Sequence, residues 1–191
     1  GIEHFGVVPD IMATGKGLSS GYTPIAATVV SDEGYDAIYQ KQRSFVHGHT
    51  YGGNPLSCAV ALAVQDYIDA HDLVENCRRM GERMLEKLKP LKGNPIVGAV
   101  RGMGLLTGVE FVADKETRAP FPVEQGVTAA IVEGVIARKV LIMPGAPGLV
   151  DGVAGDHVAI SPPFTVSEEQ ADETVRVVIE AVDETAKALG Y

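Results

Sequence analysis

The chain has 191 residues and a formal net charge of −9. Hydrophobic residues make up 46% of it and charged residues 21%, which is typical of a globular protein and argues against disorder. The acidity disfavours nucleic acid and anionic membrane surfaces as partners, and no apolar run is long enough to predict a membrane span.

Two cysteines, Cys58 and Cys77, both lie inside helical patterns. Their number and spacing predict reduced thiols in a cytoplasmic protein, and neither a disulfide framework nor a metal centre. The chain opens on the residues GIEHFG, without Met and without a charged-then-apolar leader. This opening predicts a chain that begins inside a longer protein and has no signal peptide.

The first predicted elements are two strands with a loop between them. The apolar residues 7–13 predict a short buried strand that leads into a loop carrying Lys16. The β-branched and small residues 24–30 predict a second strand, which ends at the polar residues 31–34. Loops at this place in α/β proteins often carry reactive groups.

Helical patterns follow these strands. One or two helical turns are expected over residues 35–40. Asn54 as N-cap and Pro55 as first helical residue predict a helix start, because asparagine accepts a bond from an orphan N–H and proline has none to lose. Apolar residues then recur at helical spacing until Pro90, with a break near residues 70–72. The pattern predicts one long connecting helix or two helices in tandem.

The remaining residues predict a second unit of strands and helices. Short strands are expected over residues 96–100, 105–112, 140–143 and 158–160. Arg101-Gly102 is predicted to be the turn between the first two strands, and residues 144–148 to be a loop. A helix is expected over residues 123–138 with Val127, Ile131 and Val135 on one face. A last helix is expected to start at a capping box of Ser167 and Gln170 and to carry an apolar stripe of Val175, Val178, Val182, Ala186 and Leu189.

Lys16 is the only lysine before Lys41, and it lies in the glycine-rich run ATGKGLSSG at residues 13–21. An amine that must meet a planar aldehyde cofactor needs neighbours without side-chain bulk, which the glycines supply. The alternative is a solvated loop lysine, and the local sequence does not separate the two. A nucleotide phosphate loop does not fit, because Asp10 and Gly17 occupy the positions where its pattern requires a glycine and a hydroxyl.

A second polar segment is the glycine- and histidine-rich loop at residues 46–55. His47 and His49 lie two residues apart, but two imidazoles without a third ligand are weak grounds for a metal site. Thr50 precedes glycines and a helix start, where a hydroxyl and free N–H groups can hold a phosphate. Thr50 could equally be a turn hydroxyl that bonds its own backbone.

Six stretches of the chain form a recognisable series. They are PDIMATGKGL at residues 9–18, GYTPI at 21–25, HGHTYGGNP at 47–55, RGMGL at 101–105, GDH at 155–157 and SPPF at 161–164. Together and in this order they resemble the class III aminotransferases, the pyridoxal-phosphate (PLP) enzymes that include ω-transaminases and ornithine and 4-aminobutyrate aminotransferases. The resemblance covers essentially the whole chain.

The resemblance implies roles for two residues. Lys16 would form the internal aldimine with PLP and, once displaced by the substrate amine, would move the proton between the substrate Cα and the cofactor. Thr50 would hydrogen-bond the phosphate of a cofactor bound mainly by the partner subunit. The implied assembly is a homodimer with a shared active site, and the implied substrates are an amine or amino acid and a keto acid.

The resemblance also implies an α/β fold class, as the C-terminal part of a fold type I aminotransferase. Residues 1–70 would be a remnant of the large cofactor-binding domain's sheet with the start of the long connecting helix, and residues 71–191 the small α+β domain. An acid on the pyridine nitrogen, an aromatic ring over the cofactor and a further phosphate-binding turn would precede the 15 residues before Lys16. Asp10 is too close to Lys16 to replace that acid. The parent enzyme is thus expected to transaminate, and this chain alone to be inactive.

Residues 144–154 contain neither arginine nor lysine. Many ω-transaminases carry an arginine there that clamps a substrate carboxylate, so the sequence does not predict carboxylate binding by this loop. Two other functions stay open: a non-catalytic module that self-associates through apolar surface left by missing sheet, and a lysine-based carbonyl enzyme without PLP. The latter would need acids near Lys16, and the sequence shows no such constellation.

Overall fold

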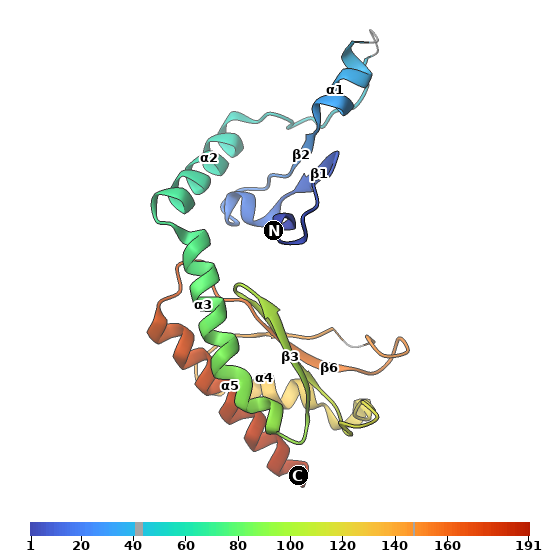
Figure 1. Ribbon diagram of the computed structural model, residues 1–191, viewed down its shortest axis with the longest axis vertical. Coiled ribbons are helices and arrows are strands. Elements are labelled where there is room, and N and C mark those ends of the chain that lie inside the picture. The colour runs from blue at the N-terminus through green and yellow to red at the C-terminus, as the bar shows by residue number, and fades with distance from the viewer. Residues whose placement is uncertain (41–43, 147) are drawn as a thin grey trace. The chain divides into compact units, whose positions relative to one another are not determined.

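The computed structural model describes residues 1–40, 44–146 and 148–191 (Figure 1). Pro147, which belongs to the predicted loop at residues 144–148, therefore lies outside the described residues. The chain forms two compact units, Gly1–His71 and Asp72–Tyr191. The assignment of residues 1–70 and 71–191 to the large and small domains of an aminotransferase stays a prediction.

Unit 1 is built on a two-stranded antiparallel ribbon (Figure 1). Strands β1 (Ile11–Thr14) and β2 (Ala27–Val30) pair so that Ile11 lies opposite Val30. The prediction of a buried strand over residues 7–13 is wrong in both bounds and burial: the strand starts at Ile11, whose side chain is 66% exposed, and Val8 before it is 94% exposed. Within the described residues of unit 1, no second layer covers the apolar side chains of this ribbon.

Short helices complete the N-terminal part of unit 1. The 3₁₀ helices η1 (Ile2–Phe5) and η2 (Lys16–Ser19) flank β1. Helix α1 (Asp32–Tyr39) starts three residues before the predicted helical turns at 35–40, because Ser31 caps it by accepting a hydrogen bond from the Gly34 N–H.

Helix α2 (Pro55–Ala70) begins where the sequence predicts. The Asn54 Oδ1 accepts the Ser57 N–H at 3.1 Å, and Pro55 occupies the first turn. A second helix, α3 (Leu73–Leu88), follows in unit 2, which confirms two helices in tandem. Asp72 lies between them at φ 50, in the left-handed region, so the helical backbone is interrupted there. Cys58 and Cys77 lie on these two helices as free thiols.

Unit 2 contains a four-stranded antiparallel sheet in the order β3-β4-β6-β5 (Figure 1). The strands are β3 (Val97–Met103), β4 (Leu106–Phe111), β5 (Met143–Pro144) and β6 (Asp156–Ile160). The 3₁₀ helices η3 (Lys89–Gly93) and η4 (Val123–Gln125) and the helices α4 (Val127–Ala137) and α5 (Glu168–Ala188) complete the unit. One hydrophobic core joins apolar side chains of the sheet with those of α3, α4 and α5.

Three predicted boundaries in unit 2 are wrong. Arg101-Gly102 is not the turn: both residues are in β3, and the two-residue turn is Gly104-Leu105. The helix predicted over 123–138 starts at Val127, because Gly126 at φ 57 separates it from η4. The strand predicted over 140–143 overlaps β5 at Met143 alone, and Pro144, predicted to be in the loop, is the second residue that pairs with β6.

The predicted helix faces of unit 2 are confirmed. Val127, Ile131 and Val135 of α4 are fully buried. The capping box of Ser167 and Gln170 is present at the start of α5. Four of the five predicted stripe residues on α5 are buried, namely Val175, Val178, Val182 and Ala186, and Leu189 packs against the core as the C-cap.

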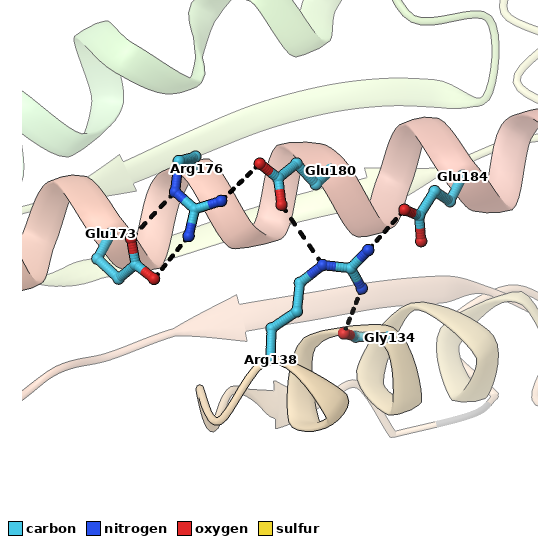
Figure 2. A network of polar contacts seen from close by, with 6 residues as sticks. All are labelled: Gly134, Arg138, Glu173, Arg176, Glu180 and Glu184. Atoms are coloured by element: carbon cyan, nitrogen blue, oxygen red, sulfur yellow. Dashed lines mark hydrogen bonds and ion pairs between the residues drawn. The ribbon is translucent and has the colours of Figure 1, made fainter.

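An ionic network joins the C-terminal end of α4 to charged side chains along α5 (Figure 2). The Arg138 guanidinium contacts the carboxylates of Glu180 at 3.4 Å and Glu184 at 2.5 Å, and donates to the Gly134 carbonyl at 2.8 Å. A cation in this place also complements the negative C-terminal end of α4. Among the described helices, none combines the length and the apolar character that a membrane crossing requires.

Candidate functional site

Lys16 lies at the start of the turn that links β1 to β2. It is the first residue of η2 and has φ 50, in the left-handed region that non-glycine residues rarely adopt. Gly15 before it is extended, and a side chain at Gly17 after it would meet nothing within 4 Å. The Lys16 side chain is exposed, and within the described ranges its amine forms neither a hydrogen bond nor an ion pair. The amine is therefore available to a small molecule.

The backbone of this turn is closed by its own hydrogen bonds. The Leu18 N–H donates to the Gly15 carbonyl at 3.1 Å, and the Ser20 N–H to the Gly17 carbonyl at 3.1 Å. The hydroxyl of Ser19, which is 1% exposed, donates to the Thr23 carbonyl at 2.6 Å. A buried serine thus anchors the turn that presents Lys16.

Helix α2 holds the same turn from outside. The Gln65 Nε2 donates to the Leu18 carbonyl at 3.2 Å, and the hydroxyls of Thr23 and Ser57 lie 2.9 Å apart. These contacts link the Lys16 turn to a helix that is distant in the sequence: Thr23 and Ser57 are 34 residues apart.

Thr50 begins the turn that leads into α2. It is exposed, and the turn is closed by the Gly52 N–H on the His49 carbonyl at 2.9 Å and by the Asn54 N–H on the Tyr51 carbonyl at 3.1 Å. A side chain at Gly52 would lie 3.1 Å from the His49 carbonyl oxygen, so the tight turn favours glycine there. The Thr50 hydroxyl is accessible at this turn.

The two predicted histidines lie beside each other. The rings of His47 and His49 are 5.1 Å apart at an interplanar angle of 85°. Within residues 1–40, 44–146 and 148–191, no cluster of three or more metal-ligating side chains is present.

Hydrogen bonds connect the segment of Lys16 with that of Thr50 indirectly. In the described chain, the two side chains do not bond each other. The link is made by residues that the sequence reasoning missed: Ser19, Thr23, Ser57 and Gln65. The sequence feature that pointed to these residues was the hydroxyl-rich run after Lys16, together with Ser57 three residues after the N-cap Asn54. The roles of Lys16 and Thr50 as cofactor residues stay predictions.

Two further motif segments have structural partners in unit 2. Arg101, on β3, forms an ion pair with Glu110 of β4 at 2.6 Å. The Asp156 Oδ1 accepts the N–H of Thr128 at 2.9 Å and its hydroxyl at 2.7 Å. Asp156 therefore caps α4 from a neighbouring strand, because the residue at the N-cap position, Gly126, has no side chain to do so.

The loop between β5 and β6 is closed by a bridge between Val150 and Ala154. The side chains of Leu149 and Val153 are 69% and 65% exposed. The described part of this loop thus presents apolar side chains.

The chain has clear relatives among known proteins. The profile of the family Aminotransferase class-III matches residues 1–182. The protein named Uncharacterized aminotransferase YodT from Bacillus subtilis (strain 168) is 41% identical over 188 residues, which are 98% of this chain and 42% of that protein. The chain therefore spans less than half the length of this curated relative.

Solved structures agree with this match. A transaminase from the marine bacterium Virgibacillus has a TM-score of 0.90 at 34% identity, covering 99% of this chain and 42% of that one. An amine transaminase from an uncultivated Pseudomonas species, solved in a PLP-bound (internal aldimine) form, has a TM-score of 0.86 at 34% identity, covering 96% of this chain and 40% of that one. The mixed α/β structure thus matches part of these enzymes. Since the family profile spans nearly all of its residues, this chain belongs to the class III aminotransferases, a PLP-dependent family.

Proposed function

We propose that this chain is the part of a class III aminotransferase that carries the cofactor lysine, in an enzyme that moves an amino group from an amine or amino acid to a keto acid. The observation that carries the proposal is the free, exposed amine of Lys16 on a glycine-flanked turn. The family profile covers the same residues.

The residues of unit 1 fit PLP. An exposed primary amine suits the aldehyde of a PLP molecule, and the accessible hydroxyl of Thr50 suits the phosphate of a PLP molecule. When bound, PLP supplies an electron sink for the bonds of the substrate Cα. Lys16 would hold the cofactor covalently in the resting state and, once released as a free amine, would carry the proton between the substrate Cα and the cofactor. Thr50 would fix the phosphate of the cofactor that belongs mainly to the partner subunit.

The proposed enzyme is a homodimer in which this chain supplies only some of the site. A PLP site also needs an acid on the pyridine nitrogen and an aromatic ring over the cofactor. We place these groups outside this chain, which spans 42% of the curated relative and of the Virgibacillus enzyme. On this proposal the isolated chain binds PLP at most weakly and does not turn over substrate.

The loop between β5 and β6 bears on the substrate. It contains no arginine or lysine, and Leu149 and Val153 are exposed on it. We propose that this loop contacts an apolar part of the substrate and does not bind a carboxylate. We also propose a cytoplasmic location, which the free thiols of Cys58 and Cys77 support.

The test uses covalent labelling. The chain is incubated with PLP and reduced with borohydride, and the modified lysine is located by peptide mass spectrometry. We expect the label on Lys16 in preference to the other lysines, and we expect Lys16→Ala to remove this preferential label. Lys139→Ala is the matched control, because Lys139 is also exposed and has φ 63.

Label spread evenly over Lys16, Lys139 and the other lysines would overturn the role of Lys16. Turnover by the 191-residue chain alone would contradict the proposal that the chain holds only part of the active site.

A second candidate is a non-catalytic module that self-associates. Unit 1 favours it, since Phe5, Val8 and Ile11 expose 71%, 94% and 66% of their surface. Apolar surface of this kind is usually covered by another chain. The mass in solution tests it: a module that associates without PLP labelling at Lys16 supports this candidate, whereas a monomer with ordered termini contradicts both.

A further inference from the structure

The turn that presents Lys16 is held in an unfavourable backbone conformation. Lys16 at φ 50 and Ser20 at φ 51 are both non-glycine residues in the left-handed region, with Gly21 following at φ 78. Such conformations persist only when surrounding contacts fix them. The contacts that fix this turn therefore decide where the Lys16 amine lies.

Those contacts come from two sources. Inside the turn, the buried Ser19 hydroxyl donates to the Thr23 carbonyl at 2.6 Å. From α2, Gln65 binds the Leu18 carbonyl at 3.2 Å, and Ser57 binds the Thr23 hydroxyl at 2.9 Å. Thr23 is thus bonded through its carbonyl to the turn and through its side chain to the helix.

Ser57, like Thr23, forms hydrogen bonds through both its side chain and its backbone. Its hydroxyl meets Thr23, and its N–H donates to the Asn54 side chain at 3.1 Å. The N–H of Asn54 in turn donates to the Tyr51 carbonyl at 3.1 Å, which closes the turn that starts at Thr50. A continuous series of hydrogen bonds therefore runs from the Lys16 turn to the Thr50 turn, all within unit 1.

We propose that Thr23 and Ser57 are positioning residues: their hydroxyl pair sets the turn that presents Lys16 to one cofactor and the turn that presents Thr50 to the partner subunit's cofactor in a fixed relation. The hydrogen bonds that fix the two turns do not depend on the function of the chain. Their importance for the cofactor rests on the proposed function. Neither side chain is assigned contact with the cofactor or substrate. Their effect passes through Ser19 to the Lys16 backbone and through Asn54 to the Thr50 turn.

The experiment measures amide hydrogen exchange in the full chain for wild type, Thr23→Val and Thr23→Ser. Valine keeps the shape of threonine and removes the hydroxyl, whereas serine keeps the hydroxyl. Thr28→Val is the matched control, because Thr28 is an exposed residue of β2 that faces no such partner in the described chain. Amides of α5 in unit 2 serve as an internal reference for intact folding.

With Thr23→Val we expect about fivefold faster exchange at the turn amides of Ser20 and Tyr22, and a similar change at Asn54 and Ser57. Thr23→Ser and Thr28→Val should exchange as wild type does. Faster exchange at Ser20 and Tyr22 alone would overturn the coupling, and so would equal exchange in all four proteins. A Thr23→Ser protein as fast as Thr23→Val would show that the methyl group matters and not the hydroxyl.

A second arm separates this inference from the proposed function. The rate at which PLP and borohydride modify Lys16 is measured in the same variants, and we expect it to fall in Thr23→Val and to recover in Thr23→Ser. If wild-type Lys16 is not labelled in preference to Lys139, the proposed function fails, while the exchange data still decide whether Thr23 and Ser57 couple the turns. If Lys16 is labelled equally in all variants, the positioning role fails and the proposed function stands.

Discussion

Asp172 is a residue whose ionisation is tied to the packing of α3 against α5. It lies on α5, and Arg83 of α3 binds both of its oxygens, with Nε at 2.7 Å and Nη2 at 2.8 Å. Lys87 adds a contact at 2.5 Å. The hydrogen bonds from Arg83, and then those from Lys87, hold the pKa of the Asp172 carboxyl well below its usual range. This carboxylate therefore favours the folded protein wherever it is ionised.

The sign of the pH dependence follows from that direction. Because the pKa of Asp172 is lower in the folded than in the unfolded chain, its contribution is complete above the unfolded value of 3.8 and is lost as the pH falls toward the folded value. We expect Asp172→Asn to lower the urea midpoint at neutral pH, and the gap from wild type to narrow progressively as the pH falls below about 5. Circular dichroism at each pH measures both midpoints. Asp151→Asn is the control, since Asp151 is exposed in a loop; a gap that stays constant with pH would contradict this account.

Residues that act through local chemistry could be predicted from the sequence. Asn54 and Ser167 cap their helices as expected, because an N-cap bonds an N–H only three residues away. The pair of Thr23 and Ser57 could not be predicted, since no short-range pattern specifies which two hydroxyls meet across 34 positions.

The position and burial of an element could be predicted where it packs an apolar face into the core, but not where it is exposed. Helices α4 and α5 carry their apolar residues on the predicted faces, because burial in the core imposes the helical period. The apolar residues of β1 predict burial, but in the described part of unit 1 no layer covers the strand. The turn between β3 and β4 was misplaced because Arg101-Gly102 has the composition of a turn, whereas the pairing of Met103 with Leu106 leaves Gly104-Leu105 as the turn.

The packing of α3 on this turn gives a prediction for Gly81. Gly81 of α3 is buried, and a side chain there would collide with the backbone of Gly104, including its carbonyl oxygen. Alanine in a helix gains about 1 kcal/mol over glycine, but overpacking costs about 1 to 3 kcal/mol, and more where backbone must move. The atoms that would collide belong to the backbone of Gly104, which has φ 54 in a tight turn and cannot move aside as a flexible side chain could. We therefore expect the steric cost to exceed the gain in helix propensity, and Gly81→Ala to destabilise unit 2 by about 1 to 2 kcal/mol.

Urea unfolding followed by circular dichroism measures this change. Gly93→Ala is the control, since a side chain there would meet nothing within 4 Å. A Gly81→Ala protein as stable as wild type would mean that α3 can move away from the turn at no cost.

At the scale of the whole chain, the family could be recognised from the sequence because its motifs are short and lie in a fixed order. The residues around Lys16 and Thr50 identify the chemistry of the parent family. Their arrangement in space depends on the contacts of α2 with the Lys16 turn, which connect distant residues and leave no local signal. On the proposed function, the rest of the site lies outside the residues of this chain, and these residues therefore do not predict it.

The two units differ sharply in how much they bury, and this difference predicts how they fold. In unit 2, apolar side chains of α3, α4, α5 and the sheet form one core. Among the described residues of unit 1, only Ser19 and Ala61 are buried. Since apolar burial is the main favourable term in folding, unit 2 has the means to fold by itself, whereas unit 1 is expected to be much less stable.

We therefore expect a fragment of residues 72–191 to unfold in urea in one cooperative transition, with a midpoint close to that of the full chain. A fragment of residues 1–71 should unfold at a much lower urea concentration, because its ribbon and helices bury little apolar surface and depend on hydrogen bonds to offset the chain entropy of ordering them. Far-ultraviolet circular dichroism across the urea series measures both fragments. A 1–71 fragment as resistant to urea as the 72–191 fragment would contradict this account, and a 72–191 fragment that fails to fold would show that its core needs the preceding residues.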